Sequence, residues 1–117
     1  MIRKCTDNHI TGSEHCKGGK GTLYSREILT IPELGGHGRK LSHSTLKPGA
    51  SVGNHAHNGD FEVYYIIKGT GTYNDNGTLV QVGPGDMTLC PDGECHGLEN
   101  TGTEPLEFIA AILYTKA

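Results

Sequence analysis

Turn-forming residue pairs recur through the second half of this chain: Pro48-Gly49, Asn76-Gly77, Pro84-Gly85 and Asp92-Gly93. Glycine supplies the positive φ angles that tight turns require, and proline interrupts both helices and central strands. The segments between these turns suit strands of about four to nine residues better than helices of about ten or more. Because 18 of the 117 residues are glycine, the pattern predicts an all-β domain.

The segments between the turns are rich in β-branched and aromatic residues, as strands are. The last segment contains alanines that a helix would accept, but Pro105 and the surrounding pattern favour a strand. No convincing helix is found, so we expect a sandwich or barrel. The predicted strands and one hairpin cover residues 22–30, 39–47, 61–69, 71–83 (the hairpin), 86–91, 95–100 and 106–115.

Charge and hydropathy exclude several classes of protein. The net charge of −3 and the absence of a basic stripe argue against nucleic-acid binding. No apolar run approaches the roughly 18 residues that span a bilayer, and the N-terminus lacks the apolar core of a secretion signal. We therefore expect a single-domain cytoplasmic protein without membrane or nucleic-acid partners.

The cysteines Cys5, Cys16, Cys90 and Cys95 have no CxxC spacing, which argues against a structural zinc site. Without an export signal we expect buried or half-buried thiols. A disulfide between Cys90 and Cys95, which flank a turn, is the alternative. The glycine-rich stretch at residues 17–21 lacks the spacing of a phosphate-binding loop and indicates a flexible lead-in to the first strand.

The stretch "NHAHNGDFE", residues 54–62, carries the strongest chemical signal. His55 and His57 are two residues apart, so on a strand both side chains point to the same face. Glu62 lies on the next predicted strand and can add a carboxylate. The two histidines alone are a weak signal, because a polar surface turn would look the same.

The wider spacing points to a family. The first motif comprises Gly49, His55, His57, Glu62 and Gly69. The second motif comprises Gly85, Pro91, Gly93, His96 and Asn100. At these spacings they resemble the two motifs of the cupin family, with the glycines marking turns and Pro91 the end of a strand.

The resemblance implies a double-stranded β-helix, the cupin jelly-roll barrel, over residues 22–117, preceded by an N-terminal arm and glycine-rich loop at residues 1–21. It also implies that one divalent transition metal is held by His55, His57, Glu62 and His96. Three imidazoles and a carboxylate suit Mn, Fe, Co, Ni or Zn. Four protein ligands on an octahedral ion leave two positions for a small oxygen-rich molecule.

Strand parity suggests further side chains near the metal. If Glu62 points inward, so does Tyr64, and if His96 points inward, so does Glu94. Tyr64 is then a candidate hydrogen-bond donor or acid and Glu94 a candidate base, so both are candidate catalytic residues. A barrel-lining aromatic and a solvated turn carboxylate are the structural alternatives. His43 is expected to be a surface or structural histidine.

Among cupins, the chain resembles small oxalate-decarboxylase-like proteins. Those decarboxylases carry an arginine shortly before the histidine pair, where this chain has Val52 and Gly53. We expect a metal-dependent enzyme that acts on a small carboxylic acid, keto-acid or sugar derivative by isomerase, decarboxylase or lyase chemistry. An iron dioxygenase and a non-catalytic binding or sensor protein are the alternatives. A homodimer is expected, with the strand at residues 22–30 contributing.

Overall fold

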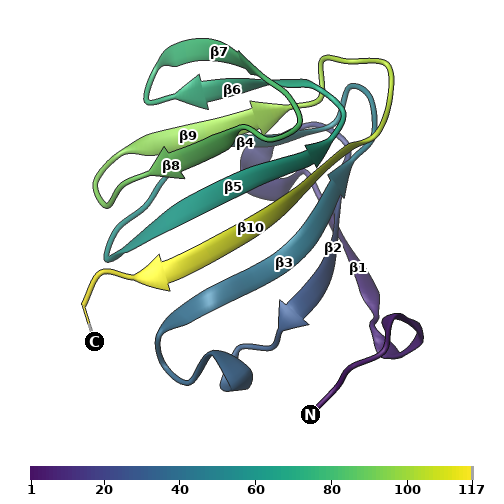
Figure 1. Ribbon diagram of the computed structural model, residues 1–117. Coiled ribbons are helices and arrows are strands. Elements are labelled where there is room, and N and C mark those ends of the chain that lie inside the picture. The colour runs from purple at the N-terminus through teal and green to yellow at the C-terminus, as the bar shows by residue number, and fades with distance from the viewer. Residues whose placement is uncertain (117) are drawn as a thin grey trace.

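The computed structural model describes residues 1–116 and contains ten strands in two antiparallel sheets (Figure 1). The larger sheet has the order β1-β2-β3-β10-β5-β8 and the smaller sheet the order β4-β9-β6-β7. The strands are β1 (Ile10–Glu14), β2 (Thr22–Leu29), β3 (Gly38–Leu46), β4 (Ser51–Ala56), β5 (Asp60–Lys68), β6 (Gly71–Asp75), β7 (Thr78–Val82), β8 (Met87–Cys90), β9 (Cys95–Glu99) and β10 (Leu106–Tyr114). The predicted all-β, double-stranded β-helix fold is confirmed.

Helical structure in residues 1–116 is limited to three short 3-10 turns: η1 (Cys5–Asp7), η2 (Cys16–Gly18) and η3 (Pro32–Leu34). None of these segments is long and apolar enough to cross a membrane. All predicted strands are present, and their ends differ from the prediction by one residue at most. Asn76 and Gly77 both have positive φ angles, 49° and 104°, as the predicted hairpin turn between β6 and β7 requires.

Two strands were not among the predicted segments. All five residues of β1 are exposed, so it has no apolar alternation by which sequence analysis could detect it. It pairs with β2 through its backbone and lies within the predicted arm at residues 1–21. The sequence of β4, SVGNHA, is polar and contains glycine because its inward positions serve the site described below.

The core lies between the two sheets. Its residues come from alternate positions of facing strands, as the period of two in a strand dictates. The largest side chains that are less than 2% exposed are Phe108, Leu46, Ile66, Leu98 and Leu106. Burying each of them contributes about 1.5–3 kcal/mol. This packing joins the two sheets beside the polar cluster described below.

Candidate metal centre

Four predicted ligands converge between the two sheets. His55 lies at the end of β4 and His57 one residue beyond it. His96 on β9 is the cross-strand partner of His55, so the smaller sheet and the residue that follows β4 supply the three imidazoles. Glu62 reaches the same point from β5 in the larger sheet. One ligand atom from each of the four residues lies within 4.8 Å of the others.

Glu62 is the hub of the cluster. Its Oε1 lies 2.9 Å from Nε2 of His96 and 3.1 Å from Nε2 of His57. His55 Nε2 lies at 3.7 Å, and His55 is the most exposed of the four. Burial disfavours the ionised carboxylate, but hydrogen bonds from the three histidines outweigh burial and hold the pKa of Glu62 well below its ordinary value. Glu62 is therefore an anion at neutral pH.

The Nδ1 atom of each histidine has a partner outside the cluster. His55 Nδ1 donates to the Gly53 carbonyl oxygen at 2.7 Å, and His57 Nδ1 donates to Asp60 Oδ1 at 2.6 Å. His96 Nδ1 shares a hydrogen bond of 2.8 Å with the Tyr73 hydroxyl. Metal-binding histidines in proteins almost always have such a second partner, which fixes the ring and its tautomer. All three Nε2 atoms are thus directed toward Glu62 and toward one point between the sheets.

The donor set fits a transition metal. The Nε2 atoms of His57 and His96 lie 3.1 Å apart, beside the Glu62 carboxylate. Burial lowers the pKa of His96, which favours the neutral imidazole that binds metals. Two ligands at right angles on an ion with bonds of about 2.1 Å lie about 3.0 Å apart. A cation at the centre would replace the protons that these nitrogen and oxygen atoms share.

Sequence reasoning missed the residues that orient the histidines. Asp60 hydrogen-bonds His57 and is itself bound by Arg39 Nε at 2.9 Å. Burial raises the pKa of the Asp60 carboxyl, but the hydrogen bonds from Arg39 and His57 outweigh burial. The pKa of Asp60 is therefore below its ordinary value. Asp60 stands inside the quoted histidine motif, so its carboxylate was a detectable signal. Tyr73 comes from β6, and nothing in its sequence context marks it.

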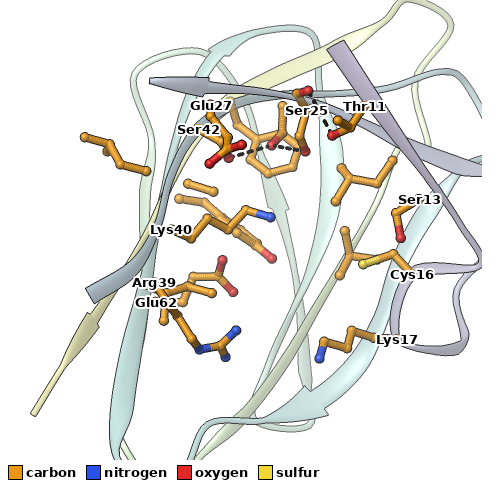
Figure 2. Close-up of a pocket in the computed structure, with 18 of the residues that line it drawn as sticks. Thr11, Ser13, Cys16, Lys17, Ser25, Glu27, Arg39, Lys40, Ser42 and Glu62 are labelled. Carbon is orange, nitrogen blue, oxygen red and sulfur yellow. Dashed lines mark hydrogen bonds between the residues drawn. The ribbon is translucent and has the colours of Figure 1, made fainter. Parts of the chain in front are cut away.

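A cavity of about 360 Å³ opens beside the cluster. His55, His57 and Glu62 form part of its wall, and β1, β2, β3 and β10 supply most of the rest. Figure 2 shows the ammonium groups of Lys17 and Lys40 on opposite sides of this space. Within residues 1–116 neither lysine has a salt-bridge partner. The cavity therefore suits an anionic ligand.

Comparison with known protein families matches residues 42–112 to the Cupin domain family. The chain belongs to the cupin family. An oxalate-binding protein of Thermotoga maritima is 41% identical to this cupin over 97 residues, which are 83% of this chain and 80% of the relative. The crystal structure of a predicted oxalate decarboxylase from Thermotoga maritima superposes with a TM-score of 0.93 at 36% identity, covering 97% of this chain and 99% of the other.

A more distant structure shares only the fold. A polyketide cyclase from Streptomyces resistomycificus has a TM-score of 0.71 at 23% identity, and the match covers 100% of this cupin and 87% of the other chain. The barrel is thus shared with a protein whose name describes a different activity, so the fold alone does not identify the function.

The two candidate catalytic residues differ in their placement in this cupin. Tyr64 is 2% exposed, lines the cavity and stacks on His96 with ring centroids 5.0 Å apart. Burial raises the pKa of Tyr64 well above its ordinary value, so its hydroxyl stays protonated at neutral pH. Glu94 precedes β9, which begins at Cys95, so strand parity does not extend to it. Among residues 1–116, Glu94 is not one of those that line the cavity.

The remaining predicted residues lie apart from the cluster. His43 Nε2 pairs with Glu107 Oε1 at 3.0 Å, beside a separate surface hollow, as expected for a structural histidine. The four cysteines are all free thiols, so Cys90 and Cys95 form no disulfide. Burial raises the pKa of Cys90 to about 11.

The glycine-rich loop is anchored against β4. Lys20 N donates to Ser51 Oγ at 2.9 Å, and Ser51 N donates to the Lys20 carbonyl oxygen at 2.8 Å. A Cβ atom at Gly53 would overlap the carbonyl oxygen of Lys17, so the two backbones touch where this cupin lacks the arginine of oxalate decarboxylases. The loop also places the Lys17 side chain in the cavity lining.

Proposed function

We propose that this cupin binds one divalent transition metal through its His55, His57, Glu62 and His96 side chains and uses it to hold a small carboxylate such as oxalate. The observation that carries the proposal is the cavity, lined by Lys17 and Lys40, that opens onto the histidine–carboxylate cluster. Bound there, Mn, Fe, Co, Ni or Zn would act as a Lewis acid for a chelating carboxylate. The relative named as an oxalate-binding protein supports this ligand class.

Binding without turnover accounts for the cavity better than catalysis. A proton-transferring enzyme needs an acid or base within hydrogen-bond reach of its substrate. The Tyr64 ring is buried and stacked on His96, and Glu94 does not line the cavity among the described residues. Tyr64 would instead support the His96 ring on which it stacks.

The enzyme hypotheses make opposite predictions about the ligand. Isomerase, decarboxylase or lyase chemistry would return an altered compound after incubation. An iron dioxygenase would consume oxygen when loaded with Fe(II) and given substrate. If the protein is a binding module, chromatography recovers the ligand unchanged and oxygen uptake stays at the background level.

The proposal predicts that Mn(II)-loaded protein binds oxalate with a stoichiometry of about one per chain in titration calorimetry. Lys17→Gln should weaken binding roughly two- to fivefold, the range for a solvent-exposed charge pair, and should reduce its dependence on salt. Lys4→Gln, which removes the same charge outside the cavity, is the matched control. Failure of metal-loaded protein to bind oxalate, with the metal content confirmed, would refute the proposed function.

We also propose a homodimer. Strand β1 is the edge of the larger sheet and all five of its residues are exposed, so its free backbone groups can pair with a second copy. Residues 22–30 were expected to contribute to the dimer interface. Because β2 already pairs with β1 and β3, these residues can contribute only their outward side chains. Sedimentation equilibrium should give twice the mass of 12.5 kDa, and a purely monomeric species would contradict the proposal.

A cytoplasmic location stays a prediction from the sequence.

A further inference from the structure

Three serines form a connected row on one wall of the cavity (Figure 2). Ser44 Oγ lies 3.1 Å from Ser25 Oγ and 3.2 Å from Ser42 Oγ. Ser42 and Ser44 are 1% and 0% exposed although both line the cavity. We call Ser25, Ser42 and Ser44 the serine ladder. Nothing in the proposed metal site requires hydroxyl groups at these positions.

The serine ladder has one donor more than it can use. Three hydroxyls carry three O–H donors, and the two hydrogen bonds within the ladder consume two of them. Among residues 1–116, no other hydrogen-bond partner exists for these three oxygen atoms. A buried donor without a partner costs about 1–3 kcal/mol, so such groups generally face a ligand or an ordered water.

The serine ladder lies well away from the metal cluster. Ser42 pairs in register with Ala110, and Ala110 pairs with Tyr64, two residues along β5 from Glu62. Ser42 and Glu62 are thus separated by two strand spacings across the sheet and by two residues along the strand. At ordinary sheet spacings their backbones lie on the order of 10 Å apart. The small side chain of Ala110, which also lines the cavity, leaves the space between them open.

The cavity is too large for oxalate alone. Its volume of about 360 Å³ corresponds to about a dozen water molecules at about 30 Å³ each. Oxalate has six non-hydrogen atoms and displaces on the order of three waters. A two-carbon dianion held at the cluster cannot touch the serine ladder. Most of the cavity would stay filled with solvent.

Lys40 adds a positive charge between the serine ladder and the metal cluster, because Ile112 pairs in register with both Lys40 and Glu62. It lies two residues before Ser42 on β3 and therefore points to the same face of the strand. Figure 2 shows its ammonium group directed into the cavity. Glu27, which pairs in register with Ser42, also lines the cavity, but its side chain is exposed, so solvent and salt screen its negative charge. The ladder and Lys40 together can bind a carboxylate with both hydrogen bonds and charge.

We propose that the serine ladder is a second subsite that binds the polar tail of an acid longer than oxalate, such as a 2-oxo dicarboxylate. This inference rests on the proposed function, because the head of the same molecule would be held at the metal. Oxalate would then fill only the head position. The serine ladder would give the cavity its selectivity for chain length and for a hydrogen-bonding tail.

A matched pair of five-carbon probes tests the inference. 2-Oxoglutarate and 2-oxopentanoate share the same head but end in a carboxylate and a methyl group. Calorimetry on the Mn(II)-loaded protein should show at least about tenfold tighter binding of 2-oxoglutarate. Ser44→Ala, which removes the central hydroxyl, should abolish most of that preference and leave oxalate binding unchanged. Ser25→Ala, at a less buried position, is a second variant in case Ser44→Ala does not fold.

The matched control is Ser13→Ala, which deletes the same hydroxyl at an exposed residue of the cavity outside the serine ladder. It should retain the preference. Equal binding of the two probes by the native protein, or an undiminished preference in both ladder variants, would overturn the inference while oxalate binding still supported the proposed function. If metal-loaded protein binds neither oxalate nor the probes, the proposed function and the inference both fail.

Discussion

Replacement of both His55 and His57 by alanine is expected to remove the bound metal from the purified protein. The change deletes two of the four donors, including His57, whose ring is fixed by the hydrogen bond to Asp60. The remaining donors, Glu62 and His96, form only half of a chelate. Elemental analysis should give about one transition-metal ion per native chain, as for a four-ligand site, and less than about a tenth of that for the double variant.

A single histidine elsewhere provides the control for this experiment. His43→Ala removes an imidazole that also faces a carboxylate, Glu107, but lies outside the cluster. It should retain the full metal content. Glu62→Gln should weaken binding less than the loss of both histidines, because the amide oxygen can still coordinate. Full metal in the double histidine variant would show that the cluster is not the metal site.

Gly53→Ala is expected to lower the free energy of unfolding by about 3 kcal/mol, as a methyl group forced into a packed position does. The added Cβ would overlap the Lys17 carbonyl oxygen and would lie 2.8 Å from the Gly19 backbone nitrogen. Both obstacles are backbone atoms, so no side chain can rotate away. Urea unfolding of native and variant protein measures the loss.

Gly83→Ala separates crowding from the general cost of replacing glycine. Its Cβ would meet only the Thr70 methyl group at 3.7 Å, an ordinary contact, and Gly83 has no positive φ angle. This variant should change stability by less than about 1 kcal/mol. A Gly53→Ala protein as stable as Gly83→Ala would mean that the loop does not pack on β4. If the loop does pack there, Gly53→Ala should also weaken oxalate binding, because Lys17 would be displaced.

Turn chemistry and motif spacing were sufficient to predict the barrel and to bring the four candidate ligands together. The two predictions depend on rules that act between residues close in sequence. Strand parity placed His55 and His57 on the same face, and the glycine-containing pairs marked the ends of the strands. Parity does not extend to Glu94, because it applies only within a strand and β9 begins one residue later. Strand β1 was missed because a fully exposed edge strand carries no apolar alternation.

The residues that shape the cavity were harder to predict because they meet only through long-range packing. Tyr73 reaches His96 from the neighbouring strand, and Ser25 reaches Ser44 across a strand pair. In the sequence these residues are indistinguishable from ordinary strand positions. The glycine-rich loop was predicted to be a flexible lead-in, whereas its backbone packs on Gly53, a contact between segments far apart in the chain.

The division of the ligands between the sheets has a mechanical consequence. His55 and His96 belong to the smaller sheet and Glu62 to the larger one, so an ion at the cluster would cross-link the two layers. A ligand that binds only the folded state adds a stabilisation that grows with its concentration above the dissociation constant. A bound metal would therefore join the two sheets at the cluster. The midpoint temperature of thermal unfolding should then rise with the concentration of free metal ion.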